Sequence, residues 1–277
     1  LSMDLREQGI DIPVCMTDED FADVIAANIT NSSMPSTDLE KMPPQKSPKD
    51  NIADQDVLLS IRDLSYTYNA AALKAAGKKQ TRQQKSWGKG HEVDWALHDV
   101  SFDIMQGEML GIAGHTGSGK STLIQHFNGL LHPNEGKVLL RGMDIADKGA
   151  AAQARRTVGM VFQYPEHQLF AATVSEDVAF GPRNMKLPAD EVDERVREAL
   201  ASVGLDVDEI GQKSPFELSG GMQRRVALAG VLAMRPEALV MDEPAAGLDP
   251  QARESMLRLI EQLHASGLTI VLVSHSM

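Results

Sequence analysis

Residues 109–122 read Met-Leu-Gly-Ile-Ala-Gly-His-Thr-Gly-Ser-Gly-Lys-Ser-Thr, and this stretch decides the fold. Its first five residues form a short apolar run that is typical of a buried strand. The rest matches the pattern G-x-x-x-x-G-K-[ST], and apolar residues then recur at helical spacing over 123–131. A glycine-rich turn between a strand and a helix lets backbone N–H groups converge on phosphate oxygens. The stretch therefore predicts an α/β fold with a phosphate-binding loop.

The residues of this loop have distinct expected roles. Lys120 is expected to reach the β- and γ-phosphates of a nucleotide, and the Ser121 hydroxyl to bind Mg²⁺. The start of the following helix adds partial positive charge. The predicted phosphate-binding residues are Gly114, His115, Thr116, Gly117, Ser118, Gly119, Lys120, Ser121 and Thr122. A glycine-rich turn without a ligand is the alternative, which the flanking strand and helix disfavour.

A second apolar run, residues 238–241, ends in Asp242 and Glu243. Strands buried in parallel sheets are continuously apolar, and ligands gather at their carboxyl ends. Asp242 is expected to bind the coordination shell of Mg²⁺, and Glu243 is expected to polarise an attacking water and accept its proton. Adjacent strand residues face opposite sides, but Pro244 ends the strand and the turn can re-aim Glu243. Such a strand end alone is more often a loop boundary; together with the glycine-rich loop it predicts a metal site.

Composition limits the other possibilities. The 277 residues are 42% hydrophobic and 24% charged, enough for a domain with a proper core. The net charge of −12 argues against sequence-independent nucleic-acid binding through a basic surface. The single cysteine, Cys15, excludes an internal disulfide and a zinc site of several cysteines. Since no run approaches 18 apolar residues, no membrane span is expected.

Two segments differ from the rest in charge. Residues 1–55 contain 11 acidic and 4 basic side chains, net −7, and several prolines. Such a segment cannot bury enough apolar surface to offset its ordering entropy, so we expect a mostly disordered acidic extension. Residues 18–28 could form a short helix within it. Residues 74–90 contain six Lys or Arg and no acid; a solvated basic loop is expected, with contact to anionic lipid as the alternative.

A second candidate anion site lies at residues 218–225, Leu-Ser-Gly-Gly-Met-Gln-Arg-Arg. An apolar helical stretch follows, and Ser219 is a good N-cap for it. Here the sequence resembles the ATP-binding cassette (ABC) ATPases, whose signature is LSGGQ. Met222 before Gln223 departs from that signature. The resemblance covers residues 56–277.

Further segments resemble the family in the same order along the chain. Residues 244–250 resemble its D-loop and include Asp249, and residues 271–275 resemble its switch strand, which ends in His275. Gln163 occupies the place of the Q-loop glutamine. Tyr68 occupies the place of the aromatic residue that stacks on adenine, with Tyr66 as the competing candidate.

The resemblance implies a role for each matching residue. Glu243 would be the catalytic base, His275 would contact the γ-phosphate, and Gln163 would sense Mg²⁺ and water. The implied magnesium-binding residues are Ser121, Gln163 and Asp242. The residues expected to contact ATP held by a partner subunit are Leu218, Ser219, Gly220, Gly221 and Met222. The implied assembly is a head-to-tail pair of ATPases with ATP between them, in which ATP favours the closed pair.

The implied architecture is the ABC-type P-loop NTPase fold. It has a RecA-like core with a parallel sheet, an antiparallel β subdomain and an α-helical subdomain, expected at about residues 165–235. An apolar helix face over 188–204 fits this helical subdomain. The sequence stops two residues after His275, where relatives continue, so we expect the C-terminal part to be truncated.

A narrower resemblance surrounds Gln163. Residues 162–170, Phe-Gln-Tyr-Pro-Glu-His-Gln-Leu-Phe, are similar to the energy-coupling factor (ECF) transporter ATPases, in particular the second, A-prime type. That family implies a peripheral protein at the cytoplasmic face of the cell membrane, with no nucleic-acid partner. The implied partners are an identical or different second ATPase, a transmembrane T component whose helices dock in a surface groove, and an S component that captures a vitamin or a transition-metal ion.

Two other functional classes remain open. One is a soluble ABC ATPase that acts on DNA or ribosomes. DNA-repair members of this class have a long coiled coil before the signature, whereas here Gln163 and Ser219 are only 56 residues apart with no heptads between them. Translation-factor members have two cassettes in one chain, and this chain has one. Both observations disfavour this class. The other is a non-hydrolysing cassette, which would be expected to lack Glu243 or His275. A metal-binding role for His167 is disfavoured, since no second ligand is suitably spaced.

Overall fold

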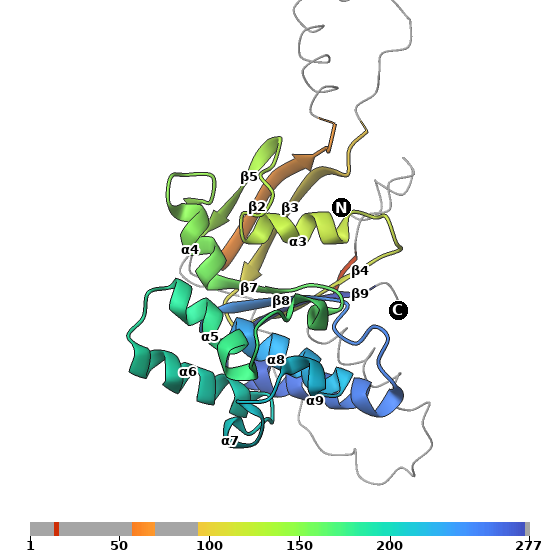
Figure 1. Ribbon diagram of the computed structural model, residues 1–277. Coiled ribbons are helices and arrows are strands. Elements are labelled where there is room, and N and C mark those ends of the chain that lie inside the picture. Colours follow the sequence, from red (N-terminus) through yellow and green to blue (C-terminus); the bar gives the residue numbers. More distant parts are fainter. Residues whose placement is uncertain (1–13, 17–56, 70–93, 275–277) are drawn as a thin grey trace, which may run out of the picture.

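The computed structural model describes residues 14–16, 57–69 and 94–274 of the chain. Their strands form two sheets, with helices packed around them (Figure 1). The strands are β1 (Val14–Met16), β2 (Val57–Tyr66), β3 (Leu97–Met105), β4 (Met109–Ala113), β5 (Glu135–Leu140), β6 (Met143–Asp144), β7 (Val158–Val161), β8 (Ala238–Asp242) and β9 (Thr269–Ser274). The helices are α3 (Lys120–Phe127), α4 (Ala150–Thr157), η2 (Pro165–Gln168), α5 (Val174–Asn184), α6 (Ala189–Ser202), α7 (Val207–Ile210), η3 (Pro215–Glu217), α8 (Gly220–Leu232) and α9 (Pro250–Ala265).

The central sheet has the strand order β1-β4-β9-β8-β7, in which β4, β9, β8 and β7 run parallel. In register, Ala113 pairs with Ser274, and Val273 pairs with Asp242. The carboxyl ends of β4, β9 and β8 therefore meet at one edge of the sheet. These strands are buried along almost their whole length, as their continuous apolar sequences predict.

Each face of the central sheet packs against a separate hydrophobic core. Val240 joins the core that contains α3 and the second sheet. Its neighbours Leu239 and Met241 join the core that contains the helices α5, α6, α8 and α9. This alternation along β8 is the two-residue period of a strand. Figure 1 shows α3 and the second sheet on one side of the central sheet, and α8 and α9 on the other.

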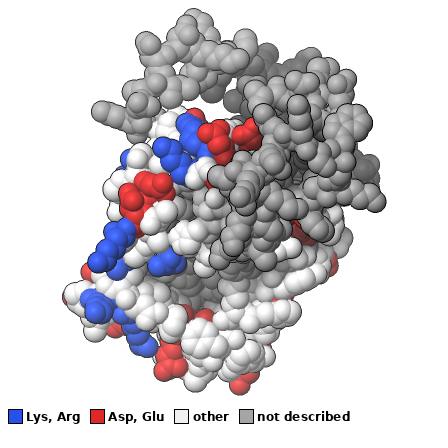
Figure 2. Space-filling view, turned by 90° about the horizontal axis from the view of Figure 1, so that it is seen from above, with Lys and Arg blue, Asp and Glu red and all other residues white. Residues whose placement is uncertain are grey.

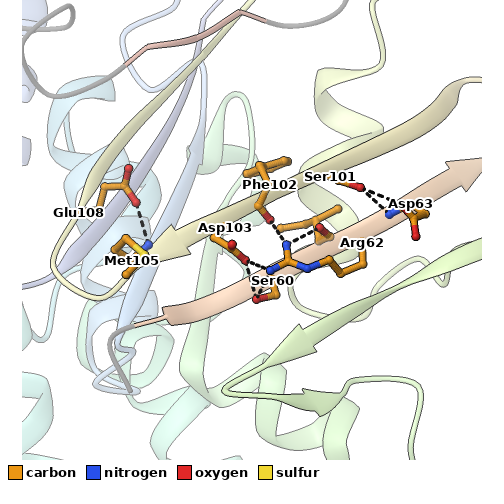
Figure 3. Close-up of polar contacts among 9 residues, drawn as sticks. Ser60, Arg62, Asp63, Ser101, Phe102, Asp103, Met105 and Glu108 are labelled. Carbon is orange, nitrogen blue, oxygen red and sulfur yellow. Dashed lines mark hydrogen bonds and ion pairs between the residues drawn. The ribbon is translucent and has the colours of Figure 1, made fainter. Parts of the chain in front are cut away.

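The second sheet is antiparallel, with the order β3-β2-β5-β6. Arg62 on β2 donates to Asp103 Oδ1 at 2.6 Å and to Phe102 O at 3.2 Å on β3 (Figure 3). Beyond β3, Glu108 Oε2 accepts a hydrogen bond from Met105 N at 2.7 Å in the turn that leads into β4. These bonds fix β3 against β2 and hold the turn that starts the strand before the glycine-rich loop.

The helices α5, α6, α7 and α8 make up most of residues 165–235. In α6 the buried side chains include Val192, Val196 and Leu200, spaced on one face as the sequence predicts. Together with the parallel and antiparallel sheets, this helical segment confirms the predicted fold class.

Some sequence predictions fall mostly or wholly outside the described residues. Within the acidic extension, Val14–Met16 pair antiparallel with β4 as β1, and the expectation that the extension is mostly disordered stays a prediction. The possible helix over 18–28 and the basic loop 74–90 lie outside the described residues. Within the described part of the chain, no helix combines the length and apolar character that a membrane span requires.

Candidate nucleotide-binding site

The glycine-rich loop turns sharply into α3 between β4 and Lys120. Gly117 and Gly119 have φ angles of +86° and +89°, a left-handed backbone that favours glycine. A Cβ atom on Gly119 would lie 2.5 Å from the carbonyl oxygen of Ala96 and 2.9 Å from Leu97 Cδ2. The loop therefore passes too close to the start of β3 for any side chain at position 119, which explains this glycine.

Lys120 is the first residue of α3 and is only 6% exposed. Its Nζ donates to the carbonyl oxygens of Gly114 at 2.6 Å and of His115 at 2.9 Å. Ser118 Oγ, also in the loop, is buried and has no hydrogen-bond partner among the described residues. An ammonium group, a hydroxyl without a partner among the described residues and the amino end of α3 are groups that suit an anion with several oxygens.

Acidic and amide side chains meet at the carboxyl edge of the parallel strands. Asp242 ends β8 and is 8% exposed. Glu243 follows with a φ of +51°, and its N–H donates to Val273 O at 3.0 Å. Gln163, two residues after β7, donates from Nε2 to Glu243 Oε2 at 3.1 Å. The positive φ of Glu243 itself, rather than Pro244 alone, turns its carboxylate away from the strand direction.

The oxygen donors at this edge suit a hard divalent cation. Ser121 is exposed on the first turn of α3, and Asp242 contributes a carboxylate from the end of β8, which β9 separates from β4. Among the described residues, no three or more His, Cys, Asp or Glu side chains are grouped so that they could hold a metal ion, so His167 belongs to no such group. Mg²⁺ commonly binds to one or two protein oxygens and to substrate phosphates, so the donor set fits Mg²⁺ carried with a nucleotide.

Tyr68 and Tyr66 differ in exposure. Tyr68 is 67% exposed, and its Oη lies 3.0 Å from Thr122 Oγ1 on α3. Tyr66 is half-buried and packs edge-on between Tyr68 and His126, with ring centroids 5.0 and 4.9 Å away. Burial raises the pKa of the Tyr66 hydroxyl, as does its neighbour Tyr68. Because Tyr68 is largely exposed, its ring is accessible to a nucleotide base, and Tyr66 packs edge-on against it.

The signature residues lie on another helix. Ser219 is the N-cap of α8, where its Oγ accepts a hydrogen bond from Met222 N at 3.4 Å, as the sequence predicts. Ser219 and Gly220 are exposed, and Leu218, Gly221 and Met222 are half-buried. Since α8 and α3 lie on opposite sides of the central sheet (Figure 1), the chain presents its two helix starts on separate faces.

The two remaining predicted site residues are Asp249 and His275. Asp249 is the N-cap of α9, and its Oδ1 accepts from Gln251 N and Ala252 N, both at 3.0 Å. The role predicted for His275 remains a prediction, because this residue lies outside the described part of the chain.

The sequence analysis missed one buried ion pair beside the site. Arg224 on α8 and Glu166 on η2 form two hydrogen bonds, at 2.8 and 3.1 Å. Burial alone would raise the pKa of Glu166, but the hydrogen bonds and positive charge of Arg224 outweigh burial and lower that pKa. An arginine on a helix that is otherwise largely apolar was the available signal.

The glycine-rich loop, the acidic strand end and the exposed signature helix define an ABC-type nucleotide-binding cassette, and residues 97–246 match the ABC transporter family. The chain belongs to this family. It is 61% identical over 183 residues to the energy-coupling factor transporter ATP-binding protein EcfA2 of Symbiobacterium thermophilum, covering 66% of this chain and 63% of that protein. With EcfA2 of Clostridium tetani the identity is 53% over 184 residues, covering 66% and 64%. The aligned part thus spans a little under two thirds of these curated relatives.

Solved structures show the same architecture. CbiO1 from Clostridium perfringens, described as part of the ABC transporter complex cbiONQ, superposes with a TM-score of 0.66 at 36% identity, covering 80% of this chain and 79% of that chain. The dimeric cassette MJ0796 bound to ADP and phosphate superposes with a TM-score of 0.62 at 29% identity, covering 79% and 88%.

Proposed function

We propose that this protein is an ATP-binding and ATP-hydrolysing subunit of an ECF-type ABC importer, of the A-prime type. In this proposal ATP hydrolysis drives uptake of a vitamin or a transition-metal ion through a transmembrane T component. The observation that carries the proposal is the hydrogen bond between Gln163 and Glu243, at the same sheet edge as the glycine-rich loop. The similarity to ECF transporter ATP-binding proteins supports the transport role.

The proposed chemistry assigns each group a separate task. The ammonium group of Lys120 exchanges its two loop carbonyls for phosphate oxygens, and Ser118 Oγ donates to another of them. Mg²⁺, held by Ser121, Asp242 and Gln163, supplies neutralisation of the phosphate charge when it is bound with ATP. Glu243 accepts the proton of the attacking water.

Adenine and the partner subunit complete the proposed site. Tyr68 stacks on adenine with its exposed ring. Ser219 and the amino end of α8 contact the nucleotide held by a second ATPase, identical or different, and His275 contacts the γ-phosphate. This arrangement uses both exposed helix starts, since each chain provides one to its own nucleotide and the other to its partner's.

A groove in the helical segment is the proposed docking surface for the T component. It has a volume of about 510 Å³ and lies among α4, η2, α5 and α8. Phe170 and Phe180 line it, 60% and 51% exposed, with their rings edge-on at 4.9 Å. Asp177 Oδ2 accepts hydrogen bonds from Phe170 N and Ala171 N, both at 2.9 Å, which fixes the rim. Exposed aromatic side chains in a groove suit an apolar helix from a membrane partner.

The surface charge gives less support to a nucleic-acid partner. On the face in Figure 2, basic and acidic side chains of the described residues lie beside one another rather than in separate areas. Electrostatic binding of DNA or RNA needs a clustered basic surface. The proposed location is the cytoplasmic face of the cell membrane, with the groove turned toward the T component, and the similarity to ECF transporter ATP-binding proteins supports it.

The decisive experiment is a pull-down of the tagged protein from membranes, with identification of the bound subunits and assay of ATP turnover. We expect a hydrophobic T component and a second ATPase; ribosomal RNA in their place would contradict the transport role. Phe180→Ala should weaken recovery of the T component. The matched control is Phe216→Ala, because Phe216 is 63% exposed and does not line the groove.

Two substitutions test the enzymatic part. Lys120→Ala should abolish ATP binding, because it removes the ammonium group that this proposal places at the phosphates. Glu243→Gln should retain binding and lose about 10²-fold or more of the turnover. Equal steady-state hydrolysis by Glu243→Gln and the parent would exclude Glu243 as the base.

A further inference from the structure

Arg224 is 4% exposed, and its guanidinium group bonds to two separate segments. Its Nε and Nη2 donate to the two carboxylate oxygens of Glu166, at 3.1 and 2.8 Å. Its Nη1 donates to the carbonyl oxygens of Pro244 at 3.2 Å and of Ala246 at 2.9 Å. A buried cation is tolerated when its hydrogen-bonding capacity is met, and all three nitrogens of this one are bonded.

These bonds close a ring that contains the proposed base. Pro244 and Ala246 belong to the turn that directly follows Glu243. Glu166 lies three residues after Gln163, whose Nε2 donates to Glu243 Oε2. The path from Glu243 through the turn to Arg224, on to Glu166 and back through Gln163 therefore returns to the carboxylate. Any rotation of α8 against the central sheet displaces a member of this ring.

The aromatic ring of Tyr164 lies beside Arg224 and the same turn. Its centroid is 5.9 Å from Arg224 Cζ. A Cβ atom on Gly247 would lie 3.5 Å from Tyr164 Cε1, so the aromatic ring packs against this part of the turn. Tyr164 and Glu243 both have positive φ angles, +57° and +51°. Non-glycine residues keep such angles only where their surroundings hold them.

We propose that Arg224 is a positioning residue, which holds the turn after Glu243 and so sets the direction of the Glu243 carboxylate. The inference rests on the proposed function in taking Glu243 as the base. The two sides of the guanidinium group have different roles in this proposal. The bonds to Pro244 and Ala246 position the turn, whereas the bonds to Glu166 balance the buried charge and orient the guanidinium plane.

This division predicts unequal effects of two conservative substitutions. Arg224→Lys keeps the charge but cannot span Glu166 and both carbonyl oxygens at once. We expect its kcat to fall about tenfold, since small displacements of a catalytic group are costly, while KM for ATP stays within about twofold. Glu166→Gln removes one of the two acceptors of Arg224 on this side, because an amide NH₂ cannot accept, but it leaves Nη1 and its bonds to Pro244 and Ala246 in place. Its kcat should fall no more than about threefold.

The control is Arg235→Lys. Arg235 lies just beyond the end of α8 and bonds to Glu198 Oε2 at 2.6 Å, but this pair is about half exposed, and its bond reaches α6 rather than the turn after Glu243. Its kcat should equal that of the parent. Equal losses in Arg224→Lys and Glu166→Gln would overturn the proposal in favour of a simple ion pair. So would a parental kcat in Arg224→Lys.

Hydrogen–deuterium exchange tests the same inference without relying on turnover. The N–H groups of Ala246 and Leu248 donate to Glu243 O and Ala245 O, at 3.0 and 3.4 Å, within the turn. In the assembled complex, their exchange should be about tenfold faster in Arg224→Lys and unchanged in Glu166→Gln. Unchanged exchange in Arg224→Lys would overturn the proposal.

The two measurements separate the possible failures. A parent complex that binds or hydrolyses no ATP contradicts the proposed function, whereas the exchange data still decide whether Arg224 holds the turn. If Arg224→Lys does not fold, Arg224→Gln replaces it. That variant keeps one donor for the carbonyl oxygens and removes the buried charge, so its exchange should lie between the parent and full loss of protection; parental exchange would overturn the proposal.

Discussion

Two neighbouring glycines of the phosphate-binding loop allow steric crowding to be separated from backbone strain. Gly117 and Gly119 have nearly equal φ angles, +86° and +89°, so an alanine at either position meets the same left-handed penalty of about 1–2 kcal/mol. At Gly117 the added Cβ has no atom within 4 Å. At Gly119 it meets Ala96 O at 2.5 Å and Leu97 Cδ2 at 2.9 Å, and overpacking of this kind adds about 1–3 kcal/mol.

We therefore expect Gly117→Ala to cost about 1–2 kcal/mol of unfolding free energy, and Gly119→Ala about 2–5 kcal/mol. Urea denaturation of the purified protein measures both, with the m-value as a check that the same surface unfolds. Because the backbone penalty cancels in the comparison, the difference between the variants reports the contact with β3. A Gly119→Ala variant that is as stable as Gly117→Ala would refute the steric explanation of this glycine.

Three other substitutions test separate parts of the structure. Burial lowers the pKa of His126 below 6.5 in the folded protein, so on acidification this side chain takes up a proton more readily in the unfolded chain. The free energy of unfolding should therefore fall as the pH drops below about 6.5. His126→Gln should reduce this slope, measured in denaturation curves, by at most about 1.4 kcal/mol per pH unit. Asp249→Ala removes the N-cap of α9 and should cost about 1 kcal/mol, measured against Asp249→Asn, which keeps an acceptor. Tyr68→Ala should weaken ATP binding about threefold to tenfold in calorimetry, whereas Tyr68→Phe, which loses only the contact with Thr122, should bind nearly as well as the parent.

Much of the fold could be predicted because its main elements follow local rules. The continuous apolar runs of β4 and β8 match their burial, and Ser219 and Asp249 begin α8 and α9 as N-caps. The glycine-rich loop lies where its motif requires, between a buried strand and a helix.

The features that were missed depend on contacts between distant segments. Glu166 and Arg224 are 58 residues apart, and no periodicity indicates that they meet. The reason for a glycine at position 119 is a carbonyl oxygen from the second sheet. The direction of Glu243 is a local feature instead: the sequence analysis allowed the turn at Pro244 to re-aim this side chain, but the strand pattern does not reveal the positive φ of Glu243 itself.

The two hydrogen bonds of Lys120 affect which ligands this cation can stabilise. Because Gly114 O and His115 O already occupy two of the three N–H donors of the ammonium group, an incoming molecule gains from those two donors only by offering acceptors better than two peptide dipoles. Ionised oxygens meet that condition, since charge-assisted bonds are about twice as strong as neutral ones. A nucleoside without phosphates does not meet it. The loop therefore binds the charged form of a compound in preference to its uncharged form, because the ligand must replace the carbonyl groups of Gly114 and His115.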